Sequence, residues 1–205
     1  DRALTWAQVD DSADRLLTML LEHGVRPGDR VGWLGSNDPA FLPVVVAARR
    51  ARAALVGLNW RLAPAELERQ AAVVAPAVTI GLESMLSEVE LGPVIAVPAD
   101  GPAPWADRPR GEALEPLPDD PTIMFFTSGS TGEPKAVRIS RRSIDLAVSE
   151  STAFTFTAGD RILVVPPQFH LAGATWCQYG LLYGVTQYYT ADTSPAGLVR
   201  ALAEP

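Results

Sequence analysis

A loop rich in serine, threonine and glycine, with a strand-like apolar run on each side, constrains the fold of this chain more than any other feature. Residues 123–127 read Ile-Met-Phe-Phe-Thr, residues 128–134 read Ser-Gly-Ser-Thr-Gly-Glu-Pro, and Lys135 opens a second run in which Val137 and Ile139 alternate with other residues. Glycine lets a backbone approach a ligand closely, and the N–H groups and hydroxyls of such a loop can point at anionic oxygens. The pattern predicts a phosphate-binding loop between two strands, with Lys135 supplying positive charge.

The loop has two other possible interpretations. The Walker phosphate loop has four residues between its glycines and a Gly-Lys-Ser/Thr ending that opens a helix. Here two residues separate Gly129 from Gly132, Pro134 precedes Lys135 and Ala136 follows it, so that motif is absent. A mobile, solvated Ser/Gly turn between two strands is the alternative that composition alone permits.

The order of the nine residues 127–135, TSGSTGEPK, is more specific than their composition. It closely resembles the phosphate-binding signature of the adenylate-forming superfamily, which comprises acyl- and aryl-CoA synthetases, luciferases and the adenylation domains of peptide synthetases. The resemblance implies that the loop holds the β- and γ-phosphates of ATP and that Thr127 contacts Mg²⁺. The phosphate-binding residues that it implies are Thr127, Ser128, Gly129, Ser130, Thr131, Gly132 and Lys135.

A second element lies at residues 165–173, Val-Pro-Pro-Gln-Phe-His-Leu-Ala-Gly. Taken alone, a histidine ahead of a helix is more often a cap or a solvated side chain than a catalyst. However, acyl- and aryl-CoA synthetases carry a similar Pro-x-Phe-His-x-x-Gly element that lines the carboxylate pocket, whereas amino-acid-activating domains usually have Phe-Asp there. The resemblance therefore implies an organic acid as substrate and His170 as the catalytic-site residue that shapes the acyl pocket. His23 ends the first predicted helix and is interpreted as a surface residue at the helix end.

Alternation of strands and helices predicts an α/β fold, with a mostly parallel sheet covered by helices on both faces. Thr5 opens a capping box before the first helix, Gly24 ends that helix, and residues 35–37 read as a turn and helix cap. Prolines among acidic residues from 98 to 121 predict a long surface connection within one domain. Further helices are expected at residues 38–51, 64–74, 141–153 and 171–183, and strands at 30–34, 54–57, 78–80, 94–97, 161–165 and 185–189.

Composition excludes several classes of protein. The 205 residues are 47% hydrophobic, enough for one well-buried domain or two small ones, and the net charge of −7 argues against nucleic-acid binding. The single cysteine, Cys177, excludes an intrachain disulfide and favours a reducing cytoplasm. The longest apolar run, residues 41–48, contains Pro43 and is too short to span a bilayer, so no transmembrane segment is expected.

The resemblance extends over nearly the whole chain, including residues 24–31 and 57–62, which by themselves read as turns and core. It implies that residues 1–205 are the N-terminal portion of the AMP-binding domain. The rest of that domain and the small C-terminal domain, with the ribose and adenine contacts and the catalytic lysine, would then lie outside this sequence. The family usually has a glycine where this chain has Ala136 and a Ser-His-Arg element near Arg141, which leaves substrate details open.

The function that the resemblance implies is that of an acid–CoA ligase for a fatty or aryl acid, with ATP, Mg²⁺ and CoA as cofactors and a small carboxylic acid as partner. Two alternatives stay open: an adenylation domain that loads a carrier protein, and a non-catalytic binding or structural protein that keeps the fold. As a fragment, the chain is expected to be inactive alone and to self-associate through a face bearing Trp176, Tyr179, Leu181 and Leu182.

Overall fold

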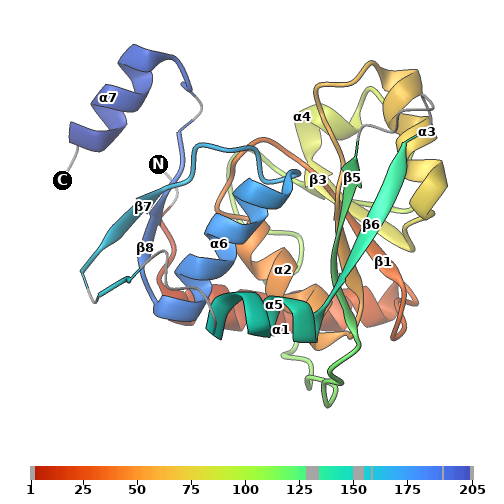
Figure 1. The fold of residues 1–205 in the computed structure, drawn as a ribbon. Helices are drawn as coiled ribbons and strands as arrows, with labels where there is room; N and C mark the ends of the chain where they lie inside the picture. Colours follow the sequence, from red (N-terminus) through yellow and green to blue (C-terminus); the bar gives the residue numbers. More distant parts are fainter. Residues whose placement is uncertain (1–2, 128–133, 150–154, 158, 191, 204–205) are drawn as a thin grey trace.

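Strands form the centre of the computed structural model, which describes residues 3–127, 134–149, 155–157, 159–190 and 192–203 (Figure 1). The strands are β1 (Arg30–Leu34), β2 (Ala54–Gly57), β3 (Val78–Leu82), β4 (Val94–Val97), β5 (Pro121–Thr127), β6 (Lys135–Ser140), β7 (Arg161–Leu163) and β8 (Thr186–Tyr188). Six of them form one sheet in the order β4-β3-β1-β2-β5-β6, in which only β5 and β6 pair antiparallel. β7 and β8 form a separate parallel pair. The predicted mostly parallel sheet is confirmed.

Helices cover both faces of the six-stranded sheet, as predicted for an α/β fold. They are α1 (Trp6–Glu22), α2 (Phe41–Arg50), α3 (Pro64–Val74), α4 (Glu83–Leu86), α5 (Arg141–Ser149), α6 (Leu171–Tyr183) and α7 (Pro195–Ala203). In Figure 1, α1, α2 and α5 lie on one side of the sheet, and α3 and α4 lie on the other. The sequence pattern did not predict α4 and α7. In the described residues, no helix is both long enough and apolar enough to cross a bilayer.

Local signals placed several helix ends correctly. The Thr5 hydroxyl accepts a hydrogen bond from the backbone N–H of Gln8 at 3.2 Å, while the Gln8 side chain accepts one from the Thr5 N–H at 2.8 Å. These two bonds satisfy N–H groups that the first helical turn leaves unpaired. His23 follows the last turn of α1, with its Nδ1 2.8 Å from the Met19 carbonyl oxygen. Its predicted place at the helix end is confirmed.

The start of α2 corrects the expectation for residues 35–38. The helix begins at Phe41, three residues later than predicted, and its N-cap Ala40 makes no side-chain capping bond. Asn37 is therefore not the helix cap, because its side chain bonds to a distant segment described below. The Asp38 carboxylate instead accepts a hydrogen bond from the Ala40 N–H at 2.7 Å. α5 was predicted to reach residue 153, but residues 150–154 lie outside those described.

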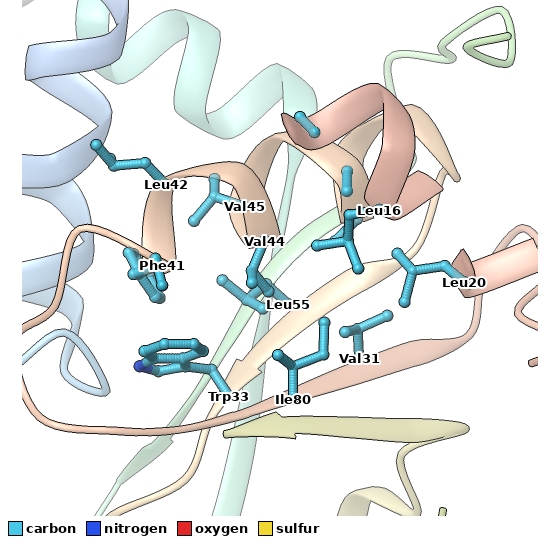
Figure 2. Packing of buried hydrophobic residues seen from close by; sticks show 14 of the residues in the cluster. Leu16, Leu20, Val31, Trp33, Phe41, Leu42, Val44, Val45, Leu55 and Ile80 are labelled. Atoms are coloured by element: carbon cyan, nitrogen blue, oxygen red, sulfur yellow. The ribbon is translucent and has the colours of Figure 1, made fainter. Parts of the chain in front are cut away.

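Alternate side chains of β1, β2 and β5 enter two different apolar clusters, as the pleat of a strand requires. Leu55 packs in the cluster below α1 and α2, whereas its neighbour Val56 packs in the cluster below α3. Figure 2 shows the first cluster, where Leu16 from α1 and Phe41 from α2 meet the sheet. Trp33 is fully buried there, and its ring meets that of Phe41 edge-on with 5.6 Å between centroids. Each fully buried leucine or phenylalanine contributes about 1.5–3 kcal/mol.

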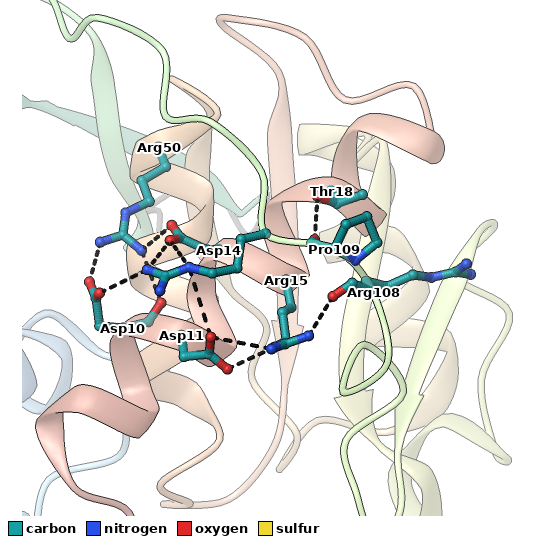
Figure 3. A network of polar contacts seen from close by, with 9 residues as sticks. Asp10, Asp11, Asp14, Arg15, Thr18, Arg50, Arg108 and Pro109 are labelled. Atoms are coloured by element: carbon teal, nitrogen blue, oxygen red, sulfur yellow. Dashed lines mark hydrogen bonds and ion pairs between the residues drawn. The ribbon is translucent and has the colours of Figure 1, made fainter.

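The proline-rich segment between β4 and β5 does run over the surface, but it is anchored more firmly than its composition suggests. Trp105 is 1% exposed, and its Nε1–H donates to the Ser12 hydroxyl at 2.7 Å. Arg110 reaches the Asp14 carboxylate at 2.6 Å, and Arg50 of α2 contacts the same carboxylate at 2.6 Å (Figure 3). The segment is thus held against α1 by one buried aromatic ring and a shared set of charges.

Candidate active site

The carboxyl ends of the parallel strands define the edge of the sheet where the predicted site residues lie. β2 and β5 are parallel neighbours, with Leu55 opposite Ile123 and Val56 opposite Met124. Gly57 and Thr127, the last residues of these two strands, therefore lie at the same edge. In parallel α/β sheets this is the edge at which ligands collect.

Thr127 and Lys135 hold the two ends of the predicted phosphate loop together. They face each other across the antiparallel β5–β6 pair, and the Thr127 hydroxyl donates to the Lys135 carbonyl at 3.4 Å. Both side chains are exposed, and within the described residues the Lys135 ammonium forms no ion pair. An exposed ammonium at this position suits an anionic ligand. The other predicted loop residues, Ser128, Gly129, Ser130, Thr131 and Gly132, lie outside the described residues.

The Phe169–His170 element is packed directly on the end of β2. A β-carbon added to Gly57 would lie 2.5 Å from the Phe169 Cα and 2.8 Å from its carbonyl oxygen, so only glycine permits this approach. His170 is the N-cap of α6, and its ring is exposed 4.9 Å from the Phe169 ring, measured between centroids. Gly57 belongs to the strand beside the one that ends at Thr127. The fold thus brings two motifs, 43 residues apart from Thr127 to His170, to one sheet edge.

Asn37, in the turn after β1, holds the backbone that leads to His170. Its Nδ2 donates to the carbonyl oxygens of Val164 at 2.9 Å and Pro166 at 3.1 Å, and more weakly to that of Val165 at 3.3 Å. Its Oδ1 accepts the N–H of Gln168 at 2.9 Å. One amide side chain therefore pairs four backbone groups of residues 164–168, which a segment outside regular structure would otherwise leave unsatisfied.

Gln168 and Arg61 are site residues that sequence reasoning missed. Gln168 is 1% exposed, and it bonds to both backbone groups of Asp38. The guanidinium of Arg61 lies 5.1 Å from the Trp60 ring centroid and 6.0 Å from that of Phe169, which adds a second exposed cation to the edge. A polar residue between Pro167 and Phe169, in an otherwise apolar run, is the one signal that could have drawn attention to Gln168.

Among the residues that the structure describes, no group of three or more His, Cys, Asp or Glu side chains is arranged to hold a metal ion. The predicted metal contact, Thr127, offers one exposed hydroxyl. Cys177 is buried, and burial raises the pKa of its thiol to about 11. The thiol therefore stays protonated at neutral pH, which argues against a role as a nucleophile.

Comparison with known proteins gives one consistent result. The sequence model of the family described as AMP-binding enzyme matches residues 1–204. A feruloyl-CoA synthase from Amycolatopsis is 33% identical over 207 residues, which are 98% of this chain and 42% of that protein. The chain therefore spans less than half the length of this relative.

Solved structures share the fold. The inhibitor-bound N-terminal domain of FACL13 from Mycobacterium tuberculosis superimposes with a TM-score of 0.82 and 27% identity, covering 98% of this chain and 54% of that one. An o-succinylbenzoate-CoA synthetase from Bacillus subtilis, solved in complex with ATP and a magnesium ion, gives a TM-score of 0.80 at 22% identity, covering 99% and 55%. The α/β architecture predicted from the sequence is therefore that of the N-terminal domains of adenylate-forming enzymes.

Proposed function

Because this chain belongs to the family of AMP-binding enzymes, we propose that it is the N-terminal part of an acid–CoA ligase. The observation that carries the proposal is the meeting of Thr127 and Lys135 with Phe169–His170 at one sheet edge. Residues 1–205 would then form the first portion of the AMP-binding domain. The remainder of that domain and a small C-terminal domain would complete the enzyme.

The proposed reaction has two steps. A carboxylate oxygen of the acid attacks the α-phosphorus of ATP, a P–O bond forms to give an acyl-adenylate, and pyrophosphate leaves. The thiol of CoA then attacks the acyl carbon, loses its proton, and displaces AMP to leave a thioester. The first step brings two anions together, so the protein has to neutralise and position the triphosphate.

The phosphate loop is assigned this task. Lys135 would contact the β- and γ-phosphates with its exposed ammonium, since charge-assisted contacts to phosphate are strong. The Thr127 hydroxyl would contact the Mg²⁺ that accompanies ATP and reduces the charge of the phosphates. Backbone N–H groups and hydroxyls complete the assigned set, which is Ser128, Gly129, Ser130, Thr131 and Gly132. The exposed hydroxyl and ammonium at the loop mouth fit such a ligand.

His170 is assigned to the acid. Its exposed ring lies beside the buried Phe169 ring at the edge of the sheet, where an apolar acyl group would contact the imidazole while its carboxylate would reach the phosphate loop. Ferulic acid and the fatty acids are both carboxylic acids without an ammonium group. We therefore propose a fatty or aryl acid as substrate, in keeping with the names of relatives such as the feruloyl-CoA synthase.

The test uses the full-length protein that contains this chain, purified and assayed for acid-dependent pyrophosphate release. The acids are ferulate, a long-chain fatty acid and a proteinogenic amino acid, each with ATP and Mg²⁺, with CoA or a carrier protein as acceptor. We expect release with one of the first two acids and a thioester on CoA. Release with the amino acid, or a thioester only on the carrier protein, would replace the ligase by an adenylation domain. No release with any acid, from a folded protein, would support the non-catalytic alternative.

A further inference from the structure

Gln168 directly precedes the buried Phe169 and the exposed His170 in the chain, and it is itself 1% exposed. Its Oε1 accepts the backbone N–H of Asp38 at 3.0 Å, and its Nε2 donates to the Asp38 carbonyl at 3.1 Å. The amide thus pairs both backbone groups of one residue. Few other side chains can do this, because the pairing needs one donor and one acceptor at the same end.

A network of neutral polar groups continues from Gln168 to Cys177 of α6, Gln187 of β8 and Tyr189. The Gln168 Nε2 lies 3.5 Å from the Cys177 sulfur, which lies 3.7 Å from the Tyr189 hydroxyl. That hydroxyl donates to the Gln187 Oε1 at 2.6 Å, and the Gln187 Nε2 donates to the Cys177 carbonyl at 2.9 Å. Burial raises the pKa of both Cys177 and Tyr189, so both groups are neutral at physiological pH. The network therefore consists of neutral hydrogen bonds that fix geometry without placing a charge behind the site.

The same segment is fixed from the other side by close packing. The Phe169 backbone touches Gly57 at the end of β2, and the carbonyls of Pro166 and Pro167 lie against Gly173 in the first turn of α6. The Gln168 side chain bonds to the turn after β1, and the Phe169 ring is also buried, at 5% exposed, whereas the His170 ring is exposed.

We propose that Gln168 is a positioning residue, which sets the orientation of the Phe169 and His170 rings through its paired hydrogen bonds with Asp38. This inference rests on the proposed acid–CoA ligase function, in which His170 shapes the acyl pocket. Gln168 acts through its neighbours, so its loss should affect use of the acid and leave the use of ATP unchanged. The phosphate loop is carried by β5 and β6, to which the described contacts of Gln168 do not extend.

The main variant is Gln168→Met in the full-length protein, since methionine has a similar length and no amide. It leaves the Asp38 N–H without this partner and leaves the Asp38 carbonyl with only the Phe41 N–H, at 3.1 Å, in a partly buried place. The segment should shift to relieve this. We expect the KM for the acid to rise about tenfold or more, because displacements near 1 Å at a site are costly. The KM for ATP should stay within about twofold, so that the two constants separate.

The matched control is Gln178→Met, on α6, the helix that follows the Gln168 segment. Gln178 is also buried, at 4% exposed, but its Oε1 has no hydrogen-bond partner within the described part of the chain. Its replacement removes a buried amide of the same size without removing a described pairing with the backbone. We expect neither KM to change in this variant.

A third variant, Gln168→Glu, restores the hydrogen bonds when it is protonated. A carboxylate can accept the Asp38 N–H but would repel the Asp38 carbonyl oxygen, whereas a protonated carboxyl can also donate to that oxygen. Burial would raise the pKa of the new carboxyl. The KM of this variant for the acid, divided by that of the wild-type protein at the same pH, should therefore decrease as the pH falls from 8 to 6.

A measurement that does not depend on activity separates the positioning role of Gln168 from the proposed acid–CoA ligase function. The Phe169 ring lies close enough to His170 for its ring current to shift the imidazole C–H resonances. These signals are identified in the NMR spectrum by their loss in His170→Ala. If Gln168→Met moves these signals, the positioning role stands even where no acid is activated and the proposed function fails. Unmoved signals in a folded Gln168→Met variant, or an equal rise in the KM for acid and for ATP, would overturn the inference.

Discussion

The backbone of Phe169 rests on Gly57, the last residue of β2, with no room for a β-carbon between them. This contact joins the segment that carries His170 to the strand beside the one that carries Thr127. The relative placement of the two motifs therefore depends on the absence of one methyl group.

The first prediction follows from this contact. Gly57→Ala should destabilise the protein by about 1–3 kcal/mol, because an added methyl group in a packed site forces the backbone to move. It should also raise the KM for the acid, since the segment that moves is that of His170. Urea unfolding and steady-state kinetics measure the two effects. Gly32→Ala is the control: its new β-carbon would meet the Thr79 hydroxyl at 2.7 Å, so it should cost stability without changing that KM.

The second prediction concerns the phosphate loop. Lys135→Ala should lower the catalytic efficiency with ATP by about tenfold to a hundredfold, since a charge-assisted contact is worth about 1.5–3 kcal/mol. The unfolding midpoint should stay unchanged because the side chain is exposed. Arg138→Ala, another exposed cation on β6, serves as the control and should have little effect. If the catalytic efficiency of the Lys135 variant is unchanged, Lys135 has no role in the proposed reaction.

The third prediction concerns His170. Replacement by alanine should change the preference among acids, or the KM for the acid, more than the KM for ATP, because the ring lies beside Phe169 and not in the phosphate loop. Initial rates over a matrix of acid and ATP concentrations give both constants. His23→Ala, at the end of α1, should leave both unchanged. Equal effects of His170→Ala on both substrates would place its role elsewhere.

The fourth prediction concerns pH and stability. Burial alone raises the pKa of Asp120, but hydrogen bonds from Arg52 and from the Leu117 N–H, with the charge of Arg52, outweigh it and hold the pKa below its ordinary value. A carboxyl with a lowered pKa in the folded state stabilises the fold above its unfolded pKa, and this contribution is lost as the pH falls through the folded pKa.

Asp120→Asn should therefore lower the free energy of unfolding at pH 7, and the difference from the wild-type protein should close as the pH falls below about 4. Urea unfolding at pH 7 and at pH 3 measures it. Asp119→Asn is the control, because the Asp119 side chain is 87% exposed and contacts Arg142 only at 3.9 Å. If the difference in the free energy of unfolding for Asp120→Asn persists at pH 3, it comes from altered packing and not from the lost charge.

Much of the fold could be predicted because its signals are local. The Thr5–Gln8 capping box and the proline at the start of α3 act within one helical turn, and both placed their helices correctly. The alternation of Leu55 and Val56 between two faces also follows from a strand's own geometry. Such features depend on residues a few positions apart, which a sequence displays directly.

The parts that could not be predicted depend on distant partners. Asn37 was interpreted as a helix cap, yet its amide bonds to carbonyls about 130 positions away, at Val164 and Pro166. Trp105 was assigned to a surface connection, but the Ser12 hydroxyl and the packing against α1 bury it. In each case tertiary contacts override a local preference. The predicted loop residues 128–132 lie outside the described structure, so their roles stay predictions.

The strand order of the central sheet also sets a sequence of events during synthesis. β1 to β4 occupy one contiguous part of the sheet and are complete once residue 97 has been made. The outer edge of β2 then has no strand to pair with until β5, which begins at Pro121, leaves the ribosome. Trp105 and Arg110 are made during that interval, and their partners Ser12 and Asp14 are already present. During synthesis, the proline-rich segment can thus pack against α1 before β5 pairs with the open edge of β2.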